Sequence, residues 1–388
     1  MAIKALPKEP FHLDVILLLI CITLVSIGYV MVISSSLHLG EKAGNVYSYP
    51  LKQLIHIVLG TALGYWVATK PLQVWEKYSK WLFLFGLLLL VLVLIPHLGV
   101  RVNGSMRWLS IGGVRIQVSE IVKIFSVVYI ASYVTRHQES VRVSAYGIVK
   151  PLAVFSVACI FLLLEPDFGS SVVILMIAMG VMFLGGARLS QFIILLSLVV
   201  VLAIILVIVE PYRMQRVTSF LHPWDHARKE GFQLVQALIS FGRGEWMGVG
   251  LGNGIQKLFY LPEAHTDFLF SVIAEELGLL GVVLVIGLFA SLVWRTFMIA
   301  QAADQAGEKF SAFVAYGLGI WFGFQAFVNM GVNMGILPTK GLTLPFMSYG
   351  GGSMISMCCA VSLLFRIYSE TYEINANKPK ERNKWLNG

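Results

Sequence analysis

Charged side chains and cysteine are both scarce in this sequence. Asp, Glu, Lys and Arg make up 13% of the 388 residues, whereas roughly 25% is usual in soluble globular domains. Hydrophobic residues reach 57%, and the mean hydropathy is +0.78. This balance excludes a soluble globular enzyme.

The four cysteines are too few and too scattered to build a site. They stand inside apolar stretches, with neither a CxxC spacing nor a Cys/His cluster: Cys21, Cys159, Cys358 and Cys359. A disulfide framework and a zinc site are therefore excluded. The excess of Lys and Arg over Asp and Glu, 29 against 21, indicates membrane topology and attraction to anionic lipid, and it argues against nucleic-acid binding.

Long apolar runs are what the sequence has in abundance. A helix needs about 20 apolar residues to cross a bilayer. The ten candidate segments are residues 15–34, 54–69, 81–95, 120–134, 152–164, 169–186, 192–209, 268–293, 310–334 and 353–368. They predict an all-α integral membrane protein with ten transmembrane helices, folded as one polytopic domain over residues 1–388.

Lys and Arg are concentrated in the connections on one side of these helices and at both ends of the chain. Positive charge gathers on the cytoplasmic side of membrane proteins, so we expect both termini to be cytoplasmic. The long connection between the seventh and eighth helices, residues 210–266, then lies on the outer face. The basic end, about residues 375–388, is predicted to be disordered near anionic headgroups.

Three ionisable residues stand where this outer loop meets the eighth helix. Pro262 and Thr266 are typical of a helix start, which places Asp267 in the first helical turn at the membrane boundary. A carboxylate there has a structural explanation, because the helix dipole stabilises it. Glu263 and His265 gather beside Asp267, however, and together they indicate a site for a polar substrate head.

A second constellation enters the fourth helix. Glu120 and Lys123 are three residues apart, so they share a helical face and can form an ion pair. Ionisable residues inside a membrane segment favour a functional hypothesis over a purely structural one. With Arg107 and Arg115 close in sequence, they predict a cationic surface for a phosphate group.

Two further stretches interrupt the helices. Residues 242–254 are rich in glycine but lack the ending of a nucleotide-binding P-loop, so we expect a tight loop against the membrane face. Glu275 and Glu276 lie inside the eighth helix, where pairing with a buried base is expected. Residues 337–353 hold two prolines and a glycine run, which forbid a continuous helix. Lys340 in this stretch suits an anionic lipid head.

Several of these stretches together resemble the SEDS family (shape, elongation, division, sporulation), and within it the division branch. The matching motifs are residues 103–108, 117–123, 165–169, 231–267 and 338–351. Two positions depart from the family pattern: Val118 stands where proline is common, and Gly352 where serine often follows the double glycine. Neither change removes a charged group, so we expect only local backbone differences.

The resemblance implies the ten-helix SEDS fold and a peptidoglycan glycosyltransferase. Such an enzyme polymerises lipid II, an undecaprenyl-diphosphate disaccharide-pentapeptide, on the outer face of the bacterial cytoplasmic (inner) membrane at the division septum. It works with a class B penicillin-binding transpeptidase of the FtsI type and other divisome membrane proteins. The essential aspartate of the family falls on Asp267, its charged fourth-helix positions fall on Arg115, Glu120 and Lys123, and Arg107 sits in its Arg-Trp motif.

The chemistry of this reaction requires particular roles from the site residues. A β link formed from an α-linked diphosphate sugar requires inversion by direct displacement, with a base for the attacking hydroxyl and cations for the leaving diphosphate. Asp267 is the candidate base. The candidate cations are Arg107, Arg115, Lys123 and Lys340. A divalent ion, Mg²⁺ or Mn²⁺, can share that charge, but no dedicated carboxylate cage is evident, and metal dependence is left open.

Two other functions compete with the polymerase. The first is a flippase or transporter for lipid-linked precursors, although the charged fourth helix has no counterpart in a second, inverted half. The second is a non-catalytic divisome scaffold. Its docking surface would be the small-residue face of the ninth helix, at Gly317, Gly319 and Gly323, although internal packing explains these glycines equally well.

Overall fold

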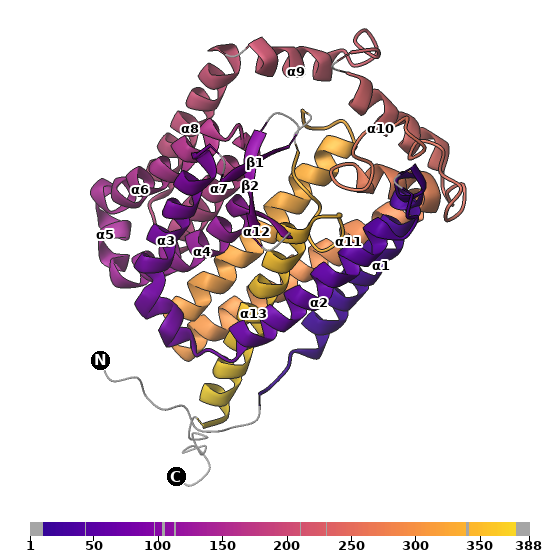
Figure 1. The fold of residues 1–388 in the computed structure, drawn as a ribbon. Coiled ribbons are helices and arrows are strands. Elements are labelled where there is room, and N and C mark those ends of the chain that lie inside the picture. The colour runs from indigo at the N-terminus through magenta and orange to yellow at the C-terminus, as the bar shows by residue number, and fades with distance from the viewer. Residues whose placement is uncertain are drawn as a thin grey trace, which may run out of the picture.

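The computed structural model describes residues 11–42, 44–96, 98–102, 105–111, 114–209, 211–229, 231–338 and 341–377. Helices dominate these residues (Figure 1). The helices are α1 (Val15–Lys42), α2 (Ser48–Ala68), α3 (Leu72–Leu94), α4 (Val118–Arg136), α5 (Gln138–Val143), α6 (Ala145–Leu164), α7 (Phe168–Leu184), α8 (Leu189–Val209), α9 (Pro211–Leu221), α10 (Phe232–Gly244), α11 (Leu269–Ala306), α12 (Lys309–Asn333) and α13 (Gly351–Asn377).

All ten predicted segments fall in helices. Within the described ranges, nine helices are long and apolar enough to cross a membrane, and α7 is a shorter apolar helix of 17 residues. The all-α membrane fold is therefore confirmed, while the count of ten crossings stays a prediction. The tail prediction falls mostly outside the described residues, although α13 continues through Asn377 and so includes its first three positions.

A small sheet between α3 and α4 was not expected. The antiparallel strands β1 (Gly99–Val102), β2 (Ser105–Ile111) and β3 (Val114–Gln117) pair in the order β1-β2-β3. In β3, aliphatic and polar residues alternate, which is the pattern of a strand with one covered face. Because β3 runs directly into α4, the sheet brings β2 and its Arg107 to the end of α4.

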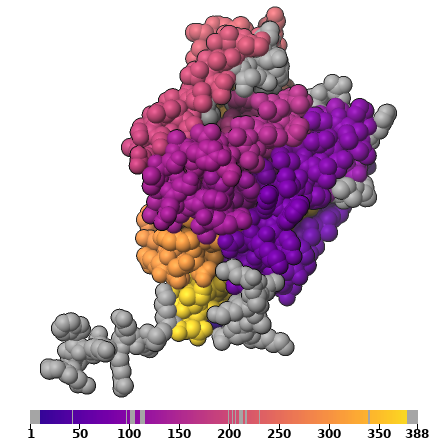
Figure 2. All heavy atoms as spheres, turned by 90° about the vertical axis from the view of Figure 1, so that its left-hand side faces the viewer, coloured from indigo at the N-terminus to yellow at the C-terminus, as the bar shows by residue number. Residues whose placement is uncertain are grey.

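The predicted outer loop 210–266 also has more structure than expected, since it contains α9 and α10. In Figure 1, α9 crosses one end of the molecule from α8 towards α10. Figure 2 shows this rose-coloured part of the chain standing above the helical bundle.

Burial divides the helices into central and peripheral ones. In the membrane-length windows of α4, α12 and α13, 78%, 67% and 67% of residues are buried, against none in α8. Helix α8 is apolar on all sides and suits a lipid surround, whereas the central helices carry serine, asparagine, glutamine and charged residues inward. The polar chemistry of the bundle therefore lies along α4, α12 and α13.

Small residues allow these helices to approach closely. Gly60 and Gly64 of α2 face α13, where an added Cβ would lie 3.0 Å from Cys358 Sγ and 2.4 Å from Ser362 Oγ. On α12, an added Cβ at Gly317 would meet Val127 and Val181, and one at Gly319 would meet Phe297. Gly317 and Gly319 thus pack inside the molecule, which removes them from the docking face considered for a scaffold.

The described beginning and end of the chain lie at the same end of the bundle. His12 N donates to Ser369 Oγ at 3.1 Å, and Arg295 pairs with Asp14 at 2.7 Å. That this end is cytoplasmic stays a prediction. The opposite end, which carries Asp267, is named the outer end after the orientation that the Lys and Arg count predicts.

Candidate active site

A non-helical segment, residues 341–350, forms the centre of the outer end, as its prolines and glycines predict. Side chains from neighbouring helices bond its backbone: Gln325 Nε2 donates to the Thr343 carbonyl at 3.0 Å, and Asn329 Nδ2 donates to the Leu342 carbonyl. Irregular backbone at membrane depth is tolerated only when protein or a water-lined cavity satisfies it. The inward polar residues of α12 supply that satisfaction.

Asp267 lies beside this segment, two residues before α11 begins at Leu269. The prediction that it sits in the first helical turn was wrong. Its carbonyl accepts from Asn329 Nδ2 and Asn333 Nδ2, both at 2.9 Å, so side chains of α12 hold the chain in a turn at this point. The Asp267 side chain is half-buried.

The approach of Asp267 to the segment depends on a glycine. A Cβ added at Gly341 would lie 2.9 Å from Asp267 Oδ2, which is closer than side-chain contacts allow. The carboxylate therefore occupies space that any other residue at position 341 would fill. Lys340, one position earlier, lies outside the described residues.

Glu120 and Lys123 pair as predicted, with Lys123 Nζ 2.8 Å from Glu120 Oε1. Lys123 is fully buried, donates to Gln325 Oε1 at 2.8 Å and lies 5.1 Å above the Trp321 ring. Because Gln325 also donates to the Thr343 carbonyl, it links the Glu120–Lys123 pair to residues 341–350, named the central segment. Direct substrate contact by either residue stays a prediction.

The two arginines sit on the sheet. Arg107 on β2 donates from Nε to the Glu165 carbonyl at 3.2 Å and from Nη2 to the Pro166 carbonyl. Its described bonds thus fasten the sheet to the turn between α6 and α7. Arg115 pairs with Ser110 in the β2–β3 ladder, and its side chain lies outside the described part.

That turn holds two acids that the sequence reasoning did not select as site residues. Glu165 is 0% exposed, and neither carboxylate oxygen has a hydrogen-bond partner among the described residues. Burial, reinforced by Asp167 and opposed by Arg107, raises the pKa of Glu165 to about 8. Asp167 accepts from Ser170 N at 3.2 Å and so caps α7. Both acids lie in the motif at residues 165–169, so the family resemblance was the signal that could have identified them.

Glu263 and His265 lie in the turn that leads to Asp267. The exposed Glu263 accepts from Thr266 Oγ1 at 2.9 Å and has a left-handed φ of 56°, so it closes the turn. His265 is half-buried, and burial lowers its pKa, against a smaller opposing effect of Glu263. The imidazole is therefore uncharged near neutral pH.

The glycine-rich stretch forms a loop that packs against α11, and its predicted place against the membrane face stays a prediction. Helix α11 breaks at Gly278, where φ is 63°, and Val249 N and Gly250 N donate to the carbonyls of Glu275 and Glu276. The predicted pairing with a buried base is confirmed, because Lys257 Nζ lies 2.5 Å from Glu276 Oε1. These bonds fix the chain that leads to the Asp267 turn.

Metal ligands are not gathered anywhere in the described part of the chain: no group of three His, Cys, Asp or Glu side chains could hold an ion there. Metal dependence stays a prediction.

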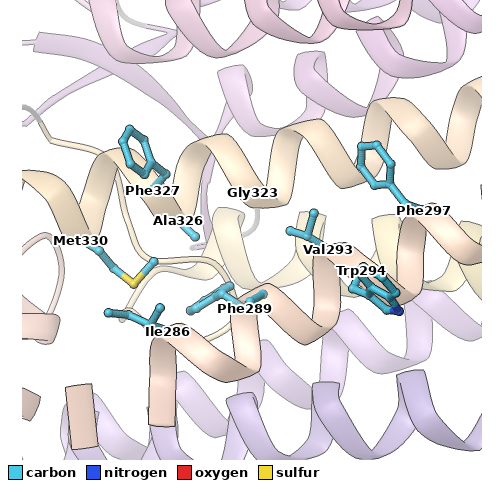
Figure 3. Close-up of a pocket in the computed structure, with 10 residues that line it drawn as sticks. Ile286, Phe289, Val293, Trp294, Phe297, Gly323, Ala326, Phe327 and Met330 are labelled. Atoms are coloured by element: carbon cyan, nitrogen blue, oxygen red, sulfur yellow. The ribbon is translucent and has the colours of Figure 1, made fainter. Parts of the chain in front are cut away.

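Helices α11 and α12 also form an apolar groove, away from the residues described above. The groove has a volume of about 590 Å³ (Figure 3). Its lining residues are Ile286, Phe289, Ala290, Val293, Trp294, Phe297, Gly323, Ala326, Phe327 and Met330. None of them can donate or accept a proton in catalysis, so the groove suits lipid or a membrane helix.

These features define a polytopic membrane protein with an acid held against a broken, glycine-containing outer segment. The FtsW/RodA/SpoVE family model, described as a cell cycle protein, matches residues 15–373. The chain belongs to this family, which is the SEDS family that its motifs resemble.

Relatives and solved structures agree with that membership. The chain is 62% identical over 382 residues to "Probable peptidoglycan glycosyltransferase FtsW" of Methylomonas methanica, covering 98% of both chains. It is 55% identical to the protein of the same name from Methylococcus capsulatus, covering 93% of this chain and 91% of the relative.

A chain in "Structural coordination of polymerization and crosslinking by a peptidoglycan synthase complex" matches with a TM-score of 0.77 and 28% identity, over 94% of this chain and 100% of that one. Thermus thermophilus RodA matches with a TM-score of 0.68 and 25% identity, over 93% and 98% of the two chains.

Proposed function

We propose that this protein is a peptidoglycan glycosyltransferase that polymerises lipid II into β-1,4-linked glycan strands for the septal wall in cell division. Membership of the FtsW/RodA/SpoVE family and the names of its FtsW relatives support this assignment. The reaction takes place at the outer face of the bacterial cytoplasmic membrane. A class B penicillin-binding transpeptidase is the partner, as the likeness to a chain of a peptidoglycan synthase complex suggests.

Asp267 is the general base in this proposal. The observation that carries it is the half-buried Asp267 carboxylate, held at the outer end against Gly341. An attacking sugar hydroxyl becomes a competent nucleophile as a carboxylate takes its proton, and the α-diphosphate leaves from the opposite face of C1 with inversion. The two asparagines that bond the Asp267 carbonyl hold the base in position through its backbone.

Cations stabilise the departing diphosphate. Arg107, Arg115 and Lys340 are assigned this role, with Mg²⁺ or Mn²⁺ as a shared counter-ion. For Arg107, binding the diphosphate means exchanging its bonds to the carbonyls of Glu165 and Pro166 for bonds to phosphate. Lys123 acts from beneath the central segment, where its partners are Glu120 and Gln325.

The test is polymerisation of lipid II by the purified protein, with and without the partner transpeptidase. Asp267→Asn should fold normally and lose about 100-fold or more in rate, because a general base contributes roughly 10²- to 10⁴-fold. Asp304→Asn is the matched control, since it alters a half-exposed ion pair with Lys309 on the far side of the molecule. A folded Asp267→Asn protein that polymerises at the parental rate would leave a flippase or scaffold role in its place.

A further inference from the structure

Four aromatic rings from three separate segments meet at the outer end. Tyr49 and His56 come from α2, His265 from the turn before α11, and Tyr349 from the segment before α13. Ring centroids of Tyr49 and His265 are 5.3 Å apart, those of Tyr49 and Tyr349 are 5.4 Å apart, and those of His265 and Tyr349 are 5.4 Å apart. Tyr49, His265 and Tyr349 therefore form a mutual contact triangle, named the aromatic triangle, with His56 at its edge.

The triangle is held in place by main-chain contacts. Tyr349 N donates to the His265 carbonyl at 2.9 Å, and Ser348 Oγ donates to the Thr266 carbonyl at 2.6 Å. Gln53, fully buried on α2, bonds both sides of Tyr349, through the Ser348 carbonyl and Gly350 N. The rings are thus pre-organised before any ligand arrives, which lowers the cost of binding.

The triangle is adjacent to the proposed base. His265 is two residues from Asp267, and two residues span at most about 7 Å between Cα atoms. Asp267 is itself fixed by its carbonyl bonds to α12. The triangle and the Asp267 turn therefore lie side by side, joined by the bonds of Tyr349 N and Ser348 Oγ.

Packing alone does not account for these rings. All three are half-buried, so each keeps part of its surface open. Within the described part of the chain, neither tyrosine hydroxyl makes a hydrogen bond to protein, which leaves both available to a ligand. Aromatic residues are common at headgroup level in membrane proteins, but these three rings come from three separate segments and contact one another.

We propose that Tyr49, His265 and Tyr349 form a stacking platform for the N-acetylated pyranose whose hydroxyl Asp267 deprotonates. The C–H groups on one face of a pyranose carry partial positive charge, and the faces of aromatic rings carry partial negative charge. The two tyrosine hydroxyls reach the polar rim of the sugar. An uncharged His265 completes the platform without drawing in a competing anion. This inference rests on the proposed function, because it assigns the acceptor sugar of that same reaction.

The experiment measures initial polymerisation rates against lipid II concentration, with full-length protein and its partner transpeptidase. Tyr349→Leu and Tyr49→Leu each remove one ring, and we expect KM to rise about 2- to 10-fold with kcat nearly unchanged, given the usual strength of aromatic contacts. Tyr349→Phe and Tyr49→Phe keep the ring and lose only the hydroxyl, so they should raise KM less than the leucine variants do. Tyr65→Leu, an exposed tyrosine elsewhere on α2, should match the parent.

A parental KM in both leucine variants overturns the proposal, and so does an equal loss in the phenylalanine variants. Lipid II binding in nanodiscs provides a second measurement, comparing Asp267→Asn with Asp267→Asn/Tyr49→Leu. The double variant should bind several-fold more weakly. Full activity of Asp267→Asn would reject Asp267 as the general base, and the KM values of the leucine variants would still test the platform. If Asp267→Asn is inactive while both leucine variants keep the parental KM, only the platform proposal is rejected.

Discussion

The described part of the chain contains two buried lysine–glutamate pairs, which differ in how completely the glutamate oxygens are bonded. In the pair between Lys257 and Glu276 of α11, Glu276 accepts from Lys257 Nζ, from Ser34 Oγ and from Gly252 N. Lys257 also donates to Ser34 Oγ and to the Gly252 carbonyl. Every oxygen of this carboxylate has a partner.

The pair on α4 is less complete. Lys123 donates to Glu120 Oε1 and to Gln325 Oε1, but Glu120 Oε2 is buried without a partner among the described residues. Leaving a buried charged oxygen unbonded costs stability, so a pair kept only for structure would not be expected to have one. The saturated pair therefore fits a structural fastening, and the unsaturated pair fits a role in the reaction.

The largest effect on stability is expected from Glu276→Gln. Losing one charge leaves Lys257 uncompensated in a buried position, which typically costs about 3–5 kcal/mol. The melting temperature in detergent should fall sharply. In Lys257→Met/Glu276→Gln, where no buried charge is left alone, part of the stability should return. A Glu276→Gln protein that melts with the parent would erase the distinction between the two pairs.

Glu120→Gln makes the same chemical change in the unsaturated pair, and its main effect should be on activity. Lys123 also loses its counter-ion, but Glu120 Oε2 has no bond to lose, whereas both oxygens of Glu276 are bonded, so we expect a smaller loss of stability than in Glu276→Gln. Polymerisation should fall about 10- to 100-fold, because the Lys123–Gln325–Thr343 linkage positions the central segment and small displacements near a site are costly. Melting curves and lipid II assays on one preparation check both parts. Equal destabilisation by Glu120→Gln and Glu276→Gln would contradict the comparison.

The two pairs also separate what the sequence predicts from what it does not. Glu120 and Lys123 are three residues apart on one helix, so helical periodicity alone places them together. A buried base for Glu276 could be expected, but its identity could not. Lys257 precedes Glu276 by 19 positions across a loop, and only the break of α11 at Gly278 brings that loop against the helix.

Other errors have the same origin in tertiary contacts. The Pro262 and Thr266 pattern predicts an earlier helix start, but Asn329 and Asn333 of α12 bond the Asp267 carbonyl and hold the chain in a turn. The bonds of Arg107 to the turn between α6 and α7 also had no signal in the sequence, while its role at the phosphate stays a prediction.

The aromatic triangle had no local signal, because its rings come from positions 49, 265 and 349. Membrane helices and their buried charges follow from periodicity and composition. The contacts between side chains from distant segments depend on how the loops fold, and sequence patterns do not predict this.

Glu165 extends the comparison to a carboxyl group with two unpartnered oxygens, and its effect on stability depends on pH. Its pKa, raised by burial and Asp167 against the opposing Arg107, is about 8 in the folded protein, against 4.5 for an ordinary glutamate. Between these values the folded state holds a proton that the unfolded state has lost. Stability therefore falls as pH rises through this window, by at most about 1.4 kcal/mol per pH unit, and levels off above it.

Glu165→Gln removes this titration, so the variant should gain stability relative to the parent from pH 5 to pH 8. Melting temperatures across that range measure the gain, with Glu263→Gln, the loss of an exposed acid at the same end, as control. A parental decline that persists unchanged in Glu165→Gln would show that Glu165 is ionised in the fold. The number of hydrogen bonds that Glu276, Glu120 and Glu165 accept would then not predict which of them is protonated.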